Sequence, residues 1–165
     1  TTFISLEKIS EASYANFIRH HFNLDGRTID DESIQFILDW TRRHTYYTQQ
    51  LCHTIFANSD KNVTLDVVRA ACGQLMKQGE AVYLQYRQML TDKQWNYLIA
   101  VAKEGCVKQI TASAFLKHHK IGTPSVSRRL AEALVEKGLL NDDVRIDGTT
   151  YTVSDVFFSH WLERL

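Results

Sequence analysis

The sequence predicts a mainly α-helical fold with one short β-hairpin near its C-terminus. Three observations support this fold class. The 165 residues contain a single proline, the residue that a helix interior tolerates least. Apolar residues recur at intervals of three and four along most of the chain, as they do on the buried face of a helix. Over residues 144–153 this spacing changes to the alternation that is typical of paired β-strands.

A helical bundle is expected over residues 1–90. Its first helix has one apolar face, made of Tyr14, Phe17, Ile18 and Phe22. Similar apolar patterns predict further helices near residues 34–41, 47–55 and 64–90. Gly79 lies inside the last of these helices and is the expected position of a kink.

A second domain is expected over residues 91–165. It begins with a capping box at Thr91–Gln94, which opens a helix that ends near Gly105. A short helix is predicted at 111–117. The next helix, 123–137, starts with Thr123 as N-cap and with a proline at its first position.

The remaining residues of this domain predict a hairpin and a last helix. Val144 and Ile146 are expected to face Tyr151 and Val153. The expected two-residue turn is Asp147-Gly148, and Asp155 is the expected cap of the last helix. Three helices, a two-stranded wing and a final helix make a winged helix-turn-helix domain, with residues 123–137 as its recognition helix. Because one fold serves many functions, this assignment alone does not fix what the domain binds.

Charge and cysteine content narrow the functional classes. Lys and Arg number 19 against 19 Asp and Glu, so the overall positive charge typical of nucleic-acid-binding proteins is missing. No apolar stretch reaches the roughly 18 residues of a membrane span, and we expect no membrane partner. The three cysteines are odd in number and far apart, which favours reduced thiols in a cytoplasmic protein. The sequence begins Thr1-Thr2 without a methionine, as expected for an excised fragment or a chain that lacks N-terminal residues.

A cluster of basic and hydroxyl side chains around the recognition helix is the candidate DNA-binding surface. Lysine and arginine neutralise phosphates, and serine hydroxyls near a helix N-terminus can donate to phosphate oxygens. The candidate residues are Lys117, Lys120, Ser125, Ser127, Arg128 and Arg129. The alternative is an ordinary solvated helix face, since acidic residues follow on the same helix and on the predicted wing: Glu132, Glu136, Asp142, Asp143 and Asp147.

The sequence predicts neither a catalytic nor a metal-binding constellation. The adjacent histidines, His20-His21 and His118-His119, should point to different sides of a helix and not share one metal ion easily. The chain has no Gly-Lys pair, which excludes a phosphate loop, and no Gly-x-Ser-x-Gly nucleophile motif. We therefore expect no catalytic residue, no metal and no cofactor in this chain, which by itself should not be an enzyme.

The most unusual string is residues 42–52, at the predicted junction of the second and third helices. It reads Arg-Arg-His-Thr-Tyr-Tyr-Thr-Gln-Gln-Leu-Cys. Tyr47 fits a position in the core. His44 and a neighbouring arginine, at an exposed helix N-terminus, are suited to an anion supplied by another domain.

This string and the C-terminal residues resemble a known family. The junction reads His-Thr-Tyr-Tyr-x-Gln-x-Leu-Cys, and the chain closes on Tyr-x-Val-x-Asp-x-x-Phe-x-x-Trp-Leu. Over essentially its whole length the chain is similar to the C-terminal lid and winged helix of prokaryotic AAA+/STAND-type ATPases of the archaeal type. In those proteins an N-terminal P-loop domain precedes the lid.

The resemblance implies a non-catalytic part of a larger ATPase. The lid would close on ATP, with Mg, bound by a missing N-terminal P-loop domain, and the winged helix would bind DNA or a protein partner. The residues carried over to the nucleotide side are Arg42, Arg43, His44, Thr45 and Tyr46, with an arginine as phosphate sensor. The family typically has Gly-x-Pro where this chain has Arg43-His44-Thr45.

Two other functional classes stay open. A free-standing winged-helix transcription regulator would use its helical half for dimerisation or effector sensing. A small helical hydrolase would need a deep polar pocket with perturbed titrating groups, for which the sequence gives no support.

Overall fold

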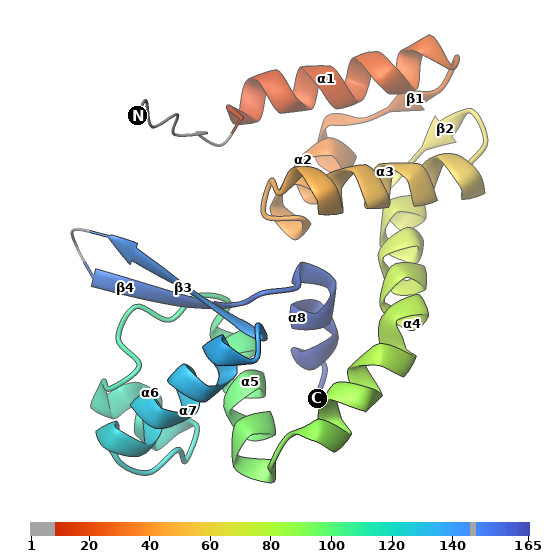
Figure 1. The fold of residues 1–165 in the computed structure, drawn as a ribbon. Helices are drawn as coiled ribbons and strands as arrows, with labels where there is room; N and C mark the ends of the chain where they lie inside the picture. Colours follow the sequence, from red (N-terminus) through yellow and green to blue (C-terminus); the bar gives the residue numbers. More distant parts are fainter. Residues whose placement is uncertain (1–8, 146–147) are drawn as a thin grey trace, which may run out of the picture. The chain divides into compact units, whose positions relative to one another are not determined.

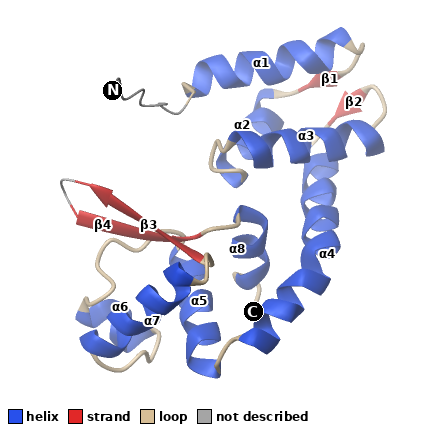
Figure 2. Cartoon of the chain, in the orientation of Figure 1, coloured by secondary structure: helices blue, strands red, loops and turns tan. Residues whose placement is uncertain are grey.

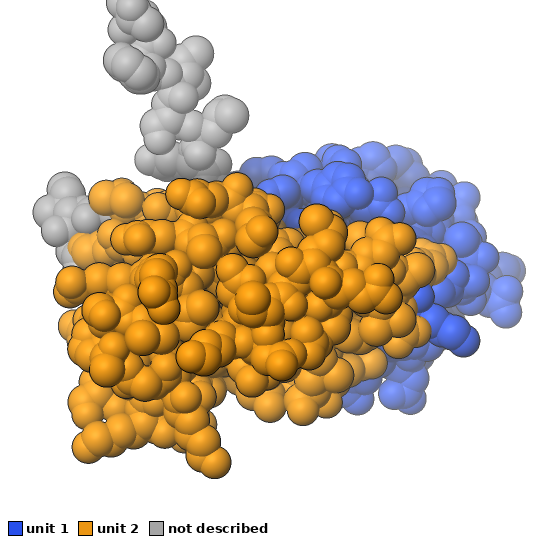
Figure 3. Space-filling view, turned by 60° about the horizontal axis from the view of Figure 1, so that its bottom comes forward, with its two compact units in different colours: residues 1–77 blue, residues 78–165 orange. Residues whose placement is uncertain are grey.

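A computed structural model describes residues 9–145 and 148–165 (Figure 1). The predicted mainly helical fold with a β-hairpin is confirmed (Figure 2). The chain divides into two compact units, Thr1–Lys77 and Gln78–Leu165, which Figure 3 colours separately. This division falls inside a helix, whereas the predicted domain boundary lies at residue 90.

The first unit is built from four helical segments and a minimal sheet. Its helices are α1 (Glu11–Leu24), α2 (Asp31–Trp40), α3 (Thr45–Asn58) and the first part of α4 (Leu65–Met89). Two-residue strands, β1 (Thr28–Ile29) and β2 (Asn62–Val63), pair in parallel. Alternation cannot be recognised in strands this short, so sequence periodicity did not predict this sheet. Its core holds the fully buried Ile37, Leu38, Leu51, Ile55 and Val68.

Helix α4 continues through Gly79, and the kink expected at this residue stays a prediction. A Cβ atom at this position would lie 2.3 Å from the hydroxyl oxygen of Tyr83. The glycine therefore leaves room for the Tyr83 ring, which lies along the helix and is itself buried in the core of the second unit. The absence of a side chain at Gly79 thus permits this close approach of the Tyr83 ring.

The second unit has the element order of a winged helix. Helices α5 (Asp92–Glu104), α6 (Ser113–His118) and α7 (Pro124–Glu136) come first, then strands β3 (Leu140–Arg145) and β4 (Gly148–Val153), then α8 (Val156–Leu162). Val107 adds a β-bridge to Tyr151, with N–O distances of 2.9 Å in both directions. Tyr83 and Tyr86 of α4, and Leu90 directly after it, complete the core of this unit.

The hairpin forms with a different register from the predicted one. Val144 pairs with Thr149, and Tyr151 pairs with Asp142. Gly148 pairs with Arg145 and so belongs to β4, whereas the other predicted turn residue, Asp147, and Ile146 lie outside the described residues. The prediction that Val144 faces Tyr151 is thus wrong. A two-residue turn at 147–148 would make residues 146 and 149 the first pair of the hairpin, whereas the observed first pair is Arg145 and Gly148.

The predicted capping box at the start of α5 forms in both directions. The Thr91 hydroxyl accepts from the Gln94 backbone N–H at 3.3 Å, and the Gln94 side-chain oxygen accepts from the Thr91 N–H at 3.1 Å. Both otherwise unpaired donors are therefore satisfied.

Replacing Thr91 by alanine is expected to lower the free energy of unfolding of the second unit by about 1 kcal/mol, because the side-chain acceptor is lost. Chemical denaturation followed by circular dichroism measures the change. Thr91→Ser keeps the hydroxyl and is the control, which should unfold like the parent. An unchanged free energy of unfolding in Thr91→Ala would show that the cap does not stabilise the helix.

Candidate functional site

Most of the residues predicted to bind DNA, on and before the recognition helix α7, are exposed. Its N-cap Thr123 accepts from the Val126 N–H at 3.4 Å, and the predicted proline occupies the first turn. The exposed candidates are Lys117, Lys120, Ser125, Arg128 and Arg129. Lys120 follows α6 with a φ of 54° and lies in the connection that leads into α7.

Ser127 was predicted to contact DNA, and this prediction is wrong, because its side chain is fully buried and cannot reach a phosphate. Its hydroxyl lies 2.6 Å from the Ile110 carbonyl oxygen, to which it donates, and 3.0 Å from the Tyr97 hydroxyl. Burial raises the pKa of Tyr97 to about 12, although the hydrogen bond with Ser127 acts in the opposite direction. This buried bond network fixes α7 against α5 and the loop before α6.

Acidic side chains lie near Arg128, the arginine of α7 that lies closest to the wing. Arg128 lines a groove together with Glu132 and Tyr151. Burial raises the pKa of Tyr151, and the neighbouring charges of Asp142 and Glu132 raise it further while Arg128 lowers it. The wing strand β3 also exposes Asp143. The face formed by α7 and the wing is therefore mixed in charge, and this groove is not strongly basic.

The junction between α2 and α3 is a tight turn of unusual backbone conformation. Helix α2 ends in a Schellman-type cap, in which the Arg43 N–H donates to the Leu38 carbonyl at 2.9 Å and the Arg42 N–H to the Asp39 carbonyl at 3.0 Å. Arg42 and Arg43 have φ values of 53° and 55°. In this type of cap the first residue after the C-cap, here Arg42, normally has a left-handed backbone. The cap does not require a left-handed backbone at the next residue, Arg43.

Helix α3 begins directly after this turn with an open N-terminus. His44 is its N-cap residue and makes no side-chain capping bond, and the first turn contains no acidic residue. Thr45 and Tyr46 are exposed, Tyr46 to 58%. The Arg43 guanidinium lies 3.7 Å from the Glu11 carboxylate, in an ion pair that is itself accessible to solvent. The five predicted nucleotide-side residues thus form one continuous surface segment.

An apolar cavity of about 230 Å³ lies between α1 and α3. Its lining includes Tyr14, Phe17 and Cys52. The buried Tyr14 hydroxyl has no hydrogen-bond partner among the described residues. Burial raises the pKa of the Cys52 thiol to about 12, so this cysteine stays protonated at neutral pH and is not a reactive thiolate.

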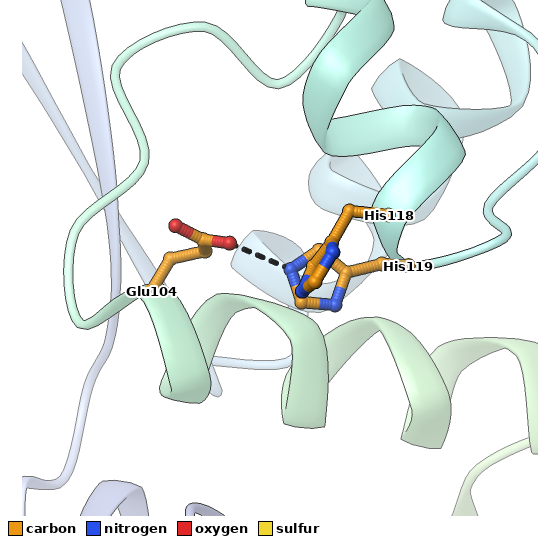
Figure 4. Close-up of side chains that lie close together, drawn as sticks. All are labelled: Glu104, His118 and His119. Carbon is orange, nitrogen blue, oxygen red and sulfur yellow. Dashed lines mark hydrogen bonds and ion pairs between the residues drawn. The ribbon is translucent and has the colours of Figure 1, made fainter.

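Glu104, His118 and His119 form a cluster that sequence reasoning did not predict (Figure 4). The His119 Nε2 atom lies 2.8 Å from a Glu104 carboxylate oxygen. The two imidazole rings have centroids 4.6 Å apart and cross at 87°. The expectation that these adjacent histidines point apart is wrong, because they lie at the very end of α6, across from the end of α5.

The comparisons with known proteins agree with the fold of the second unit. Three helices, a hairpin and a closing helix place this unit in the winged helix class. Residues 81–164 match the family described as "Probable winged helix domain", just over half of the chain. The chain therefore belongs to this winged helix family, whose fold serves DNA or protein binding. No curated protein matches the chain, and no described helix is both long and apolar enough to cross a membrane.

Replacing Ser127 by alanine is expected to destabilise the second unit by about 1–3 kcal/mol, because the Tyr97 hydroxyl and the Ile110 carbonyl lose a buried partner. Thermal or chemical denaturation measures this loss. Ser125→Ala, two residues earlier and exposed, is the matched control and should be nearly neutral. Equal stability of both variants would contradict a structural role for Ser127.

Proposed function

We propose that this chain is the lid and winged helix of a P-loop ATPase and works in the cytoplasm. The phosphate-loop domain would be supplied from outside this sequence. The single observation that carries the proposal is the left-handed backbone at Arg43. The ATPases that the chain resembles have glycine there, the residue that adopts this conformation without strain. Thr45, where they have proline, is the first residue of α3, the helix position that proline favours.

The junction has the groups that an anionic ligand requires. The open N-terminus of α3 presents backbone N–H groups and the positive end of the helix dipole. Arg43 adds a guanidinium that can donate two parallel hydrogen bonds to a phosphate. Its present partner is the exposed Glu11 carboxylate at 3.7 Å, and such solvent-exposed ion pairs contribute little stability. ATP can exchange this weak contact for a stronger one.

ATP would close the lid if it made these contacts in only one arrangement of the lid and the P-loop domain. A ligand shifts a conformational equilibrium only through its different affinity for the two states. In this proposal the junction residues contact the nucleotide when the lid is closed, and these contacts break when the lid opens. The residues are Arg42, Arg43, His44, Thr45 and Tyr46. Mg and the phosphates would be held by the other domain, so the isolated chain is not expected to bind ATP.

For the winged helix we favour a protein partner over DNA. A duplex requires a basic face that follows its phosphates. Here Glu132 and Asp142 act on the same groove as Arg128, and the exposed Asp143 continues the acidic character along the wing. A free-standing DNA-binding regulator, the alternative function, would place these carboxylates against phosphates.

The ATPase proposal is tested on the native polypeptide. An antibody against this chain is expected to detect a protein well above 19.1 kDa in the source cells. In that purified protein Arg43→Gly should lower ATP hydrolysis at least ~tenfold, as expected for an arginine that stabilises phosphate charge. Glycine fits the local backbone, so the thermal stability should not fall.

A native protein of only 19 kDa would contradict this proposal and favour the regulator. An Arg43→Gly enzyme with unchanged ATP hydrolysis would contradict the phosphate contact of Arg43, but not the ATPase assignment, because the ATPases that the chain resembles have glycine at this position. Glu11→Gln is the matched control, because it removes the partner of Arg43 and leaves the guanidinium in place; its hydrolysis rate should stay near that of the parent.

The choice between protein and DNA is tested by titrating a labelled duplex with the chain at several salt concentrations. If the partner is a protein, Arg128→Ala combined with Arg129→Ala should leave the weak duplex binding and its salt slope nearly unchanged. If the face binds DNA, the same double variant should weaken binding and lower the slope by up to about two.

A further inference from the structure

We propose that Glu104, His118 and His119 bind a Zn²⁺ ion, with one coordination position left for water or for the Cys106 thiolate. All three side chains belong to the winged helix unit and come from the facing ends of α5 and α6. The proposal does not depend on the ATPase function, because none of these residues belongs to the α2–α3 junction.

The distances already approach those of a zinc site. One ligand atom from each of the three side chains lies within 4.8 Å of the other two. In a tetrahedral site with bonds of about 2.0–2.1 Å, neighbouring ligand atoms lie roughly 3.3 Å apart. The His119 Nε2 and Glu104 oxygen, now 2.8 Å apart, need to separate by only about half an ångström to admit a metal in place of the shared proton. The exposed His118 supplies the third ligand atom, which lies within 4.8 Å of the other two.

The ligand types favour zinc over calcium and magnesium. Two imidazoles and one carboxylate provide nitrogen and oxygen donors, a set that suits Zn²⁺ when one position remains open. Ca²⁺ and Mg²⁺ prefer sites made of oxygen ligands. A bound cation would also neutralise the Glu104 carboxylate without requiring a protonated histidine.

The backbone holds the three side chains in place before any metal binds. Glu104 is the last residue of α5, and Gly105 turns the chain away with a φ of 68°. The His119 N–H donates to the Phe115 carbonyl at 3.1 Å, and the His119 ring packs 5.0 Å from the ring of the buried Phe115. Two of the three ligands are therefore positioned by buried or capped structure, which lowers the ordering cost of binding.

Cys106 supplies the candidate for the open position. It is exposed and follows Glu104 by two residues. Its side chain lines the same surface groove as Glu104 and His118. A thiolate is a strong zinc ligand, so ligation by Cys106 would close the site, whereas a water molecule would leave it exchangeable.

The experiment uses the intact chain after its metal has been removed by chelator dialysis. Zn²⁺ is added in competition with a chromophoric chelator, which gives stoichiometry and affinity together. We expect one ion per chain. Glu104→Gln and His118→Ala should each weaken binding at least ~tenfold, since even the loss of a residue that only supports a ligand has effects of this size. Both residues are exposed, so the variants should fold, which their melting curves will show.

His20→Ala is the matched control, because His20 belongs to the other adjacent histidine pair and lies outside the cluster. It should bind zinc like the parent. Cobalt substitution then identifies the fourth ligand: a thiolate-to-cobalt charge-transfer band, absent in Cys106→Ser, indicates the cysteine, and four-coordinate d–d bands without it indicate water. Parent-like affinity in both Glu104→Gln and His118→Ala, or a parent chain that cannot compete with the chelator, would overturn the proposal.

Discussion

The winged helix depends on the packing around Phe158. This residue is almost completely buried, and its ring stacks on Tyr83 with centroids 4.8 Å apart. Tyr86 and Trp95 also pack around it, at 5.4 and 6.1 Å. The contacts join α8 to the end of α4 and to α5, segments that are distant in the sequence. Each aromatic pair contributes about 0.5–1.5 kcal/mol beyond the area it buries, so the cluster fixes how the chain closes after the hairpin.

The placement of the recognition helix follows from this closed core. Once α5 is held by the aromatic cluster, its Tyr97 meets the buried hydroxyl of Ser127 on α7. That contact sets the rotation of α7, and the rotation decides which side chains face outward. Ser125 and Arg128 are exposed because Ser127 points inward. The exposed face of α7 is thus a consequence of core packing, and its mixed charge comes from the side chains that the core leaves exposed.

Local signals in the sequence were sufficient to predict the main helices and three of their N-caps. Thr91, Thr123 and Asp155 each accept the backbone hydrogen bond that their position predicts, because a cap involves atoms only three residues apart. Contacts between distant residues were not predictable in this way. The direction of the Ser127 hydroxyl depends on Tyr97 and Ile110, and no periodic pattern records it.

The missed cluster and the missed register have the same physical origin. Glu104 and His119 meet because two helix ends face each other, which spacing along the chain does not reveal. In the hairpin, the strong turn preference of Asp-Gly suggested one register, but Leu140 and Val153 pair opposite each other and both are buried. Burial of this pair selects the observed register, because a slip of the pairing would separate the two core residues.

Arg43 has a strained backbone conformation in the segment that we propose to face a nucleotide. A non-glycine residue in a left-handed conformation costs roughly 1–2 kcal/mol, and the cap of α2 accounts for this conformation only at Arg42. The Arg43 contact with Glu11, at 3.7 Å between exposed side chains, is too weak to offset that cost. Glycine would form the same turn without strain but would lack the guanidinium. The turn therefore holds a cation beside the open N-terminus of α3 at the expense of stability, and the phosphate contact that we propose for Arg43 would give this strained backbone a function.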